Sequence, residues 1–172
     1  RMALTKVIGS GIGTVTNQFA DTNMSAGSII QSTELSSAAD FSTTSTSFVD
    51  TTYLLSITPQ FTSSKILILS TIVGRVDGSG GTLRAGYRWV RRVGGSDTVI
   101  ANTDGQFEHL QVRGSPAEVS GINGYMYVDS PSTTSAVTYV CQTFKQDTSD
   151  ISAVRARQLT AGGSLILLEI RG

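Results

Sequence analysis

Few side chains in this sequence could do chemistry, and they are scattered. His109 is the single histidine and follows Glu108, a pair that could act as a general base or contribute to a metal site. A metal site needs three or four ligands, and neither an HxH nor an HExxH spacing is present. We therefore interpret His109 as a surface or interface histidine, and we predict no catalytic residue and no metal site.

Aspartates are the other candidates for chemistry. A pair of carboxylates could serve a glycosidase, and the Gly-containing turns at Asp77 and Asp104 could bind calcium. Neither an EF-hand loop pattern nor the repeat of a long β-helix is present. Because Asp is favoured in turns for backbone capping, we predict neither a hydrolase nor a bound metal from this set, which comprises Asp40, Asp50, Asp77, Asp97, Asp104 and Asp129.

The glycine cluster and the single cysteine also do not indicate a cofactor-binding loop or a catalytic nucleophile. The glycines at Gly9, Gly11 and Gly13 lack the preceding strand and following helix of a dinucleotide fingerprint, and no Walker lysine follows them. Cys141 lies in the alternating stretch AVTYVCQTF with no base beside it, so we interpret it as a buried small hydrophobe. A single cysteine allows no internal disulfide, which fits folding in a reducing cytosol.

The charge balance restricts the possible partners. Among 172 residues, 13 are basic and 13 acidic, so the formal net charge is zero. A nucleic-acid or anionic-membrane surface needs a basic excess, and no apolar run is long enough for a membrane span. We therefore expect no nucleic-acid partner, no membrane insertion and no cofactor.

Short strands separated by turns account for most of the chain. No segment shows a sustained helical apolar period, and Gly, Pro, Asp and Ser clusters recur between apolar runs. Roughly nine or ten strands at such spacing predict an all-β fold, an antiparallel β-sandwich of the jelly-roll type, over residues 28–172. The expected strands are Ser28–Leu35, Phe48–Thr58, Lys65–Arg75, Arg84–Val93, Thr98–Ala101, Gln106–Arg113, Glu118–Val128, Ala136–Phe144, Ile151–Leu159 and Ser164–Ile170. Between the first two of these, the Ser/Thr-rich stretch 38–47 is expected to be a loop.

Two of these strands are apolar on both faces. An antiparallel strand with one wet face should alternate apolar and polar residues, but Lys65–Arg75 and Ser164–Ile170 do not. We predict that one face packs into the core and that the other packs on a second layer or another subunit. The interface hypothesis comprises Ile66, Leu67, Ile68, Leu69, Leu165, Ile166, Leu167 and Leu168.

The strand Arg84–Val93 alternates most clearly. Ala85, Tyr87 and Trp89 share one face and are expected in the core. The arginines of the opposite face could bind anionic sugars or a neighbouring acidic strand, but we favour a solvated face paired with Asp or Glu across the sheet. These possible ligand residues are Arg84, Arg88 and Arg92; for Tyr125 and Tyr127 on another strand, core packing is favoured over sugar stacking.

The N-terminal stretch, residues 1–27, differs from the rest. It is rich in Gly, Ser, Thr and Asn, keeps no strand or helix period, and lacks the apolar core of a signal peptide. We expect an extended arm that docks on a neighbouring subunit or a larger particle; a flexible leader is the alternative. The docking residues are expected to be Leu4, Val7, Ile8, Ile12, Val15 and Phe19.

Three segments of the chain resemble short structural proteins of tailed bacteriophages, particularly marine and cyanobacterial ones. They are TSFVDTTYLLSITPQFTSSKILILSTIVGRV, GYRWVRR and YVDSPSTTSAVTYVCQTF, and the opening MALTKV is similar to the start of many phage tail-fibre proteins. The resemblance covers roughly residues 28–170, and its motifs are packing and turn motifs. It carries over no catalytic motif.

What the resemblance implies is a virion component, assembled in the host cytoplasm. A tail fibre or fibre tip is the first expectation: a homotrimer that joins other virion proteins through its N-terminal arm and could touch a host-surface glycan. A capsid decoration or head-fibre protein of the same fold is one alternative. The other is a carbohydrate-binding module or minor hydrolase, which would be a monomer with an aromatic, acid-lined groove.

Overall fold

The computed structural model describes residues 24–35, 38–79, 82–100, 108–113, 118–146, 151–157 and 163–172. These residues form strands joined by turns and contain no helix, which confirms the predicted all-β class. Accordingly, no helix in the described ranges could cross a bilayer. The strands are β1 (Ile29–Leu35), β2 (Phe41–Thr43), β3 (Val49–Ile57), β4 (Lys65–Gly78), β5 (Thr82–Val93), β6 (Ser96–Val99), β7 (Glu108–Arg113), β8 (Glu118–Asp129), β9 (Val137–Lys145), β10 (Ile151–Arg157) and β11 (Ser164–Ile170).

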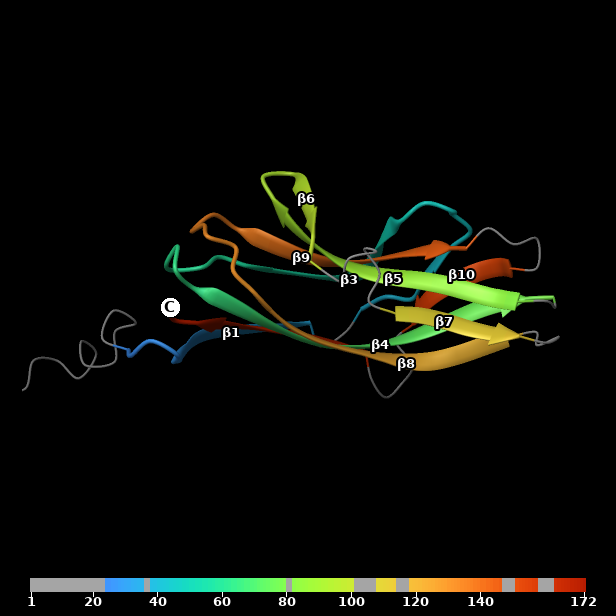
Figure 1. The fold of residues 1–172 in the computed structure, drawn as a ribbon, viewed down its shortest axis with the longest axis horizontal. Helices are drawn as coiled ribbons and strands as arrows, with labels where there is room; N and C mark the ends of the chain where they lie inside the picture. Colours follow the sequence, from blue (N-terminus) through green and yellow to red (C-terminus); the bar gives the residue numbers. More distant parts are fainter. Residues whose placement is uncertain are drawn as a thin grey trace, which may run out of the picture.

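The strands form two antiparallel sheets, which lie as two layers in Figure 1. Sheet A has six strands in the order β1-β11-β4-β10-β2, with β8 also paired to β4. Sheet B has five strands in the order β3-β9-β5-β6, with β7 also paired to β5. The long strands β4 and β5 are therefore the centres of their sheets.

The strand order is that of a jelly roll. β11 and β10 pair with successive parts of β4, and β7 and β6 pair with successive parts of β5. With each pair counted as one interrupted strand and the three-residue β2 set aside, eight strands remain in the described chain. Their order is β1, β10–β11, β4, β8 in one sheet and β3, β9, β5, β6–β7 in the other. The first strand lies beside the last, as in a double Greek key of eight strands.

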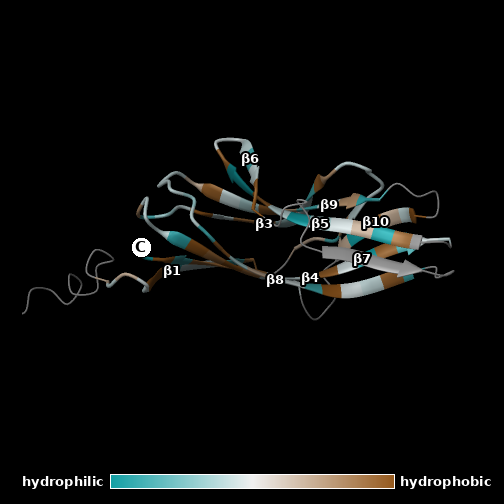
Figure 2. Ribbon diagram, in the orientation of Figure 1, coloured by the Kyte–Doolittle hydropathy of each residue, from teal (hydrophilic) through white to brown (hydrophobic). Residues whose placement is uncertain are grey.

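The core lies between the two sheets. Its largest fully buried side chains are Trp89, Tyr53, Tyr87 and Tyr139, and aliphatic residues of β4, β9 and β11 fill the space around them. In Figure 2, hydrophobic residues occur along strands of both layers. Ala85 belongs to the same core, so the predicted inward face of β5 is confirmed.

Several boundaries differ from the expected ones. The predicted loop 38–47 contains the short strand β2, and β4 continues to Gly78. Gly94 and Gly95 have φ values of 57° and 84°, which suits the tight hairpin between β5 and β6. Ser96 and Asp97, expected in that turn, therefore begin β6. The arm residues Leu4, Val7, Ile8, Ile12, Val15 and Phe19 lie outside the described residues, so the arm and its boundary stay predictions.

A buried carboxylate joins the last strand to its surroundings. Glu169 lies on the inner side of β11 and is fully buried. It accepts hydrogen bonds from the backbone N–H of Gln60 (2.7 Å), the hydroxyl of Ser64 (2.5 Å) and the amide of Gln31. The acid therefore ties the turn between β3 and β4 to both β1 and β11.

Candidate assembly surface

The outer side of sheet A carries a row of apolar side chains on three adjacent strands. Residues that are opposite one another in register point to the same side of a sheet. Met126 of β8 is thus aligned with Leu69 of β4 and Ile166 of β11, and the next row brings together Val128, Leu67 and Leu168. We define the apolar face as Leu67, Leu69, Ile122, Met126, Val128, Ile166, Leu168 and Ile170.

Side chains of β8 are the most exposed part of the apolar face. Met126 is 74% exposed, Ile122 73% and Val128 48%, whereas the members on β4 and β11 are half-buried by their neighbours. Single exposed apolar residues are ordinary on protein surfaces, but a contiguous apolar patch marks an interaction site. The outer side of sheet A is therefore the candidate interaction surface of the described residues.

Charged residues occupy the other end of the same side. Asp77 accepts hydrogen bonds from Arg75 and Arg155 (2.5 Å from the latter), and Arg75 also pairs with Glu118 at 2.9 Å. Partial burial raises the pKa of Asp77, but the hydrogen bonds from Arg155 and Arg75 outweigh burial and hold it below its usual range. These groups satisfy one another within the chain. At the other end, the apolar face is bordered by two exposed charged residues, Glu34 opposite Ile166 and Lys65 opposite Ile170.

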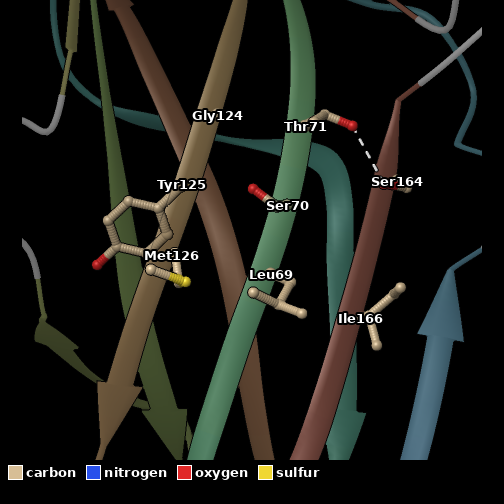
Figure 3. A pocket seen from close by; sticks show the side chains of 8 residues that line it. All are labelled: Leu69, Ser70, Thr71, Gly124, Tyr125, Met126, Ser164 and Ile166. Atoms are coloured by element: carbon tan, nitrogen blue, oxygen red, sulfur yellow. Dashed lines mark hydrogen bonds between the residues drawn. The ribbon is translucent and has the colours of Figure 1, made fainter.

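A shallow furrow crosses the apolar face (Figure 3). Gly124, Thr71 and Ser164 form one row across β8, β4 and β11, and all three are small. The row beside it is bulky, with Met126, Leu69 and Ile166. We call the first row the furrow and the second the ridge.

The structure divides the predicted interface residues into two sets. Leu67, Leu69, Ile166 and Leu168 lie on the apolar face, where another subunit could reach them. The other four are fully buried in the core of this chain, because alternate residues of a strand point to opposite sides. They are therefore removed from the interface hypothesis: Ile66, Ile68, Leu165 and Leu167.

The sequence reasoning did not find the contribution of β8 to this surface. Ile122, Met126 and Val128 alternate with glycine, asparagine and tyrosine in GINGYMYVD. The alternation of Ile122, Gly124, Met126 and Val128 was the available signal. The position of Met126 and Val128 beside Leu69 and Leu67 depends on the β4–β8 register, which the sequence does not contain.

Two arginines of β5, Arg88 and Arg92, are engaged within the chain. Arg92 pairs with Asp50 at 2.8 Å and with Asp97 at 2.6 Å, while Arg88 donates to Gln142 at 2.7 Å and lies 3.9 Å from the Phe48 ring centroid. Partial burial raises the pKa of Asp50, but hydrogen bonds from Arg92 and Gln142 hold it below its usual range. Arg92 therefore has the acidic partners that were predicted, whereas Arg88 contacts an amide and an aromatic ring. Arg84 lies half-buried on the same side of β5.

Two further candidate residues, Cys141 and Tyr125, are packed inside the fold. Cys141 is fully buried, and burial raises the pKa of its thiol, so it is not poised as a nucleophile. Tyr125 stacks on Trp89, with ring centroids 5.9 Å apart, and on Tyr127 at 6.0 Å, so it packs as expected while Tyr127 remains 39% exposed. Among the described residues, no cluster of His, Cys, Asp and Glu could hold a metal. Asp104 and the side chain of His109 lie outside them.

Comparison with known proteins yields only distant structural similarity. No protein-family profile and no curated protein matches the chain. It is similar to solved structures of infectious bursal virus derived T=1 particles, with 11% identity and a TM-score of 0.45 over 83% of this chain and 32% of that one. It is also similar to the infectious bursal disease virus VP2 subviral particle, with 12% identity and a TM-score of 0.45 over 83% and 33%. The chain spans about a third of the length of those chains, and a likeness at this level bears on neither function nor partners.

Proposed function

We propose that this chain is a structural virion protein of a tailed phage, a tail fibre or fibre tip that assembles as a homotrimer through the apolar face. The observation that carries the assembly role is the exposed apolar side of β8 beside β4 and β11. The phage context comes from the resemblance of the segments Thr46–Val76, Gly86–Arg92 and Tyr127–Phe144. The role is mechanical and adhesive, and it needs no catalytic centre.

The energetics favour assembly by burial of this face. Fully burying an exposed aliphatic side chain contributes about 1.5–3 kcal/mol. Ile122, Met126 and Val128 together would contribute on the order of 5 kcal/mol for each subunit, which is similar to the lower estimates of the cost of association. The half-buried residues of β4 and β11 supply the surplus that a stable complex requires.

The two ends of the molecule would have different tasks in a fibre. The arm enters sheet A beside the C-terminus, where the backbone N–H of Gly27 donates to the carbonyl of Arg171 at 2.7 Å. The arm would join other virion proteins, and loops at the opposite end of the sandwich would meet the host surface and its glycans. A capsid decoration protein would use the same apolar face and differ in its place on the particle.

A carbohydrate-binding module is the less favoured alternative. It calls for an aromatic groove with acidic residues. No carboxylate lines the furrow, and the ring of Tyr125, which lies next to Gly124 in the chain, points to the inner side and stacks on Trp89. A partner that is apolar and uncharged fits this lining better than a sugar does.

Light scattering on a size-exclusion column, over a range of concentrations, tests the assembly role. We expect a trimer for the native chain and a monomer for Met126→Asp, because a charge would be buried in the contact. Ser120→Asp is the matched control, since it introduces the same charge on β8 at the ion-paired end. A native chain that is monomeric at every concentration would contradict the proposal, and labelled antibody on particles would distinguish a fibre from a decoration protein.

A further inference from the structure

β8 is an edge strand, and it differs from the other edges of the two sheets. Among the described strands it pairs only with β4, so one side of its backbone has no neighbouring strand. Its ladder with β4 has no register shift, and no residue from Val119 to Val128 is charged or a proline. Every second residue of such an edge directs its N–H and C=O groups away from the sheet, where another strand can pair with them.

The other edges of the described sheets have features that protect an edge from pairing. β2, β6 and β7 are only three, four and six residues long. The ladder of β1 has a register shift between Ile29 and Gln31, and that of β3 has one between Asp50 and Leu54. Among the described strands, β8 alone is therefore a long, regular and uncharged edge.

The second half of β8 is the accessible part of this edge. β7 begins opposite Tyr87 of β5, and the Tyr87 hydroxyl and the Asn123 amide both lie against Gly74. β7 therefore ends near the level of Asn123, and β8 continues beyond it from Gly124 onward. A Cβ atom placed on Gly124 would have no heavy atom within 4 Å, so the space beside this position is open.

The side chains of this half are exposed on both sides of the sheet. Met126 and Val128 are exposed on the outer side. Tyr127 points to the inner side, where its ring stacks on that of Tyr125, and it is still 39% exposed. Exposure on both sides of one strand is expected where the next strand of a sheet is missing.

The N-terminal stretch fits this edge in length and composition. Residues 1–23 precede the described chain, and at about 3.3 Å per residue they would span up to about 75 Å when extended. Within them, Ile12–Phe19 contains neither a charged residue nor a proline. Most of its residues are β-branched or aromatic, which favours a strand.

The point where this stretch enters the fold suits a contact between copies. One row of the register joins Gln31, Glu169, Ile66 and Asp129, so β1 begins at the same end of sheet A at which β8 ends. Three strand spacings, about 14 Å, separate β1 from β8, and each is an edge of the sheet. A segment that leaves the β1 edge of one copy and pairs with the β8 edge of the next makes a head-to-tail contact, and such contacts close into rings.

We propose that Ile12–Phe19 of one copy adds as a strand to the free edge of β8 in the next copy, beside Gly124–Val128, and closes the trimer head to tail. This inference rests on the assembly role proposed above and adds a partner segment to it. The added strand would cover Tyr127 on the inner side as well as Met126 and Val128 on the outer side. Residues 1–11 would stay available for other virion proteins.

Prolines in the stretch test the pairing without altering a strand of the described fold. Proline has no N–H to donate, and two in succession remove one donor from each side of an added strand. We expect Val15→Pro/Thr16→Pro to raise the concentration at which half of the trimer dissociates roughly tenfold to a hundredfold. Light scattering over a dilution series measures this, and thermal melting monitors the fold. Gly9→Pro/Ser10→Pro is the matched control, because it places two prolines in the same stretch outside the paired segment.

Cross-linking identifies the copy that supplies the strand. The Val15→Cys/Met126→Cys variant is treated with a short bismaleimide, and the native Cys141 does not compete because it is fully buried. We expect covalent dimers and trimers on a denaturing gel. Val15→Cys/Ser120→Cys is the control, since its second cysteine is exposed on the same strand outside the paired part, and it should give far less of these products.

The outcomes separate this proposal from the assembly role. Dissociation of the Val15→Pro/Thr16→Pro chain, with an unchanged control and cross-links between copies, supports strand addition. A Val15→Pro/Thr16→Pro chain that assembles like the native one, while Met126→Asp dissociates, overturns strand addition and leaves the assembly role intact. Cross-links within single chains alone overturn the head-to-tail contact. A native chain that is monomeric at every concentration overturns both proposals.

Discussion

Glu169 is a carboxylate inside one of the most apolar strands of the chain, and its surroundings explain why. It receives hydrogen bonds from Gln60, Ser64 and Gln31, so it completes the turn between β3 and β4. Replacing it with an apolar residue would leave the buried hydroxyl of Ser64 and the part-buried N–H of Gln60 without this acceptor, each at a cost of about 1–3 kcal/mol, while the amide of Gln31 keeps its hydrogen bond to the carbonyl of Thr58.

We expect Glu169→Leu to lower the free energy of unfolding by about 3 kcal/mol, although it makes β11 more apolar. Urea denaturation, followed by tryptophan fluorescence, gives the value. Glu34→Leu on the exposed side of β1 is the control, with an expected change below about 0.5 kcal/mol. Similar losses in the two variants would contradict the role given to Glu169.

Gly74 and Gly124 make a second comparison between single residues. The Cβ of Gly74→Ala would crowd the Tyr87 hydroxyl and lie 3.0 Å from the amide nitrogen of Asn123, so we expect a loss of about 1–3 kcal/mol. Gly124→Ala should be neutral or stabilise the folded monomer by up to about 1 kcal/mol. Denaturant titrations of both variants, under conditions where the protein is monomeric, check the expectation. A loss of equal size at both positions would be the contrary result.

At the scale of elements, the β5–β6 hairpin depends on two glycines in the left-handed region. Residues other than glycine pay roughly 1–2 kcal/mol there. We expect Gly95→Ala to destabilise the protein by about 1 kcal/mol and to weaken the contact that positions Asp97 beside Arg92. Urea titration measures the loss. Gly94→Ala should show the same effect, and an unchanged midpoint in both would mean that the hairpin is not fixed by this turn.

How much could be predicted from the sequence also differs between elements. Strands with clear alternation, such as β5, were placed within two residues, because side-chain period and turn chemistry are local properties. The jelly-roll class followed from the number and spacing of such strands. The pairing of the strands could not be predicted, since the alignment of β8 with β4 depends on contacts between residues that are distant in the sequence. The interface hypothesis therefore contained residues of both faces, four of which lie in the core, and it did not contain the exposed residues of β8.

At the scale of the whole molecule, two ion-paired aspartates link stability to pH. The pKa values of Asp50 and Asp77 are lowered in the folded state, so both carboxylates stabilise it fully above their ordinary range. As pH falls, the unfolded chain takes up protons first, and this stability is lost while pH approaches the lowered folded pKa. We expect the melting temperature to fall between about pH 5 and pH 3.

The double variant Asp50→Asn/Asp77→Asn should show a shallower fall over the same range, although it is less stable at neutral pH. Melting curves at a series of pH values provide the measurement. Glu34→Gln removes an exposed acid and should keep the native slope. Parallel curves for the native chain and the double variant would show that other carboxylates control the acid response.

The neighbouring positions of β1 and β11 have a mechanical consequence. Ile29 lies opposite Ile170, and the backbone N–H of Gly27 donates a hydrogen bond to the carbonyl of Arg171. Both ends of the described chain therefore leave sheet A at the same place. A force that pulls these two ends apart would open the β1–β11 ladder one hydrogen bond at a time. A force between the N-terminal end and the far tip of the sandwich would load the bonds along β1 together, because it acts parallel to the strand. The β1–β11 pair therefore resists a shearing force better than a peeling force. A protein that is attached through its N-terminal side alone would load this pair in shear.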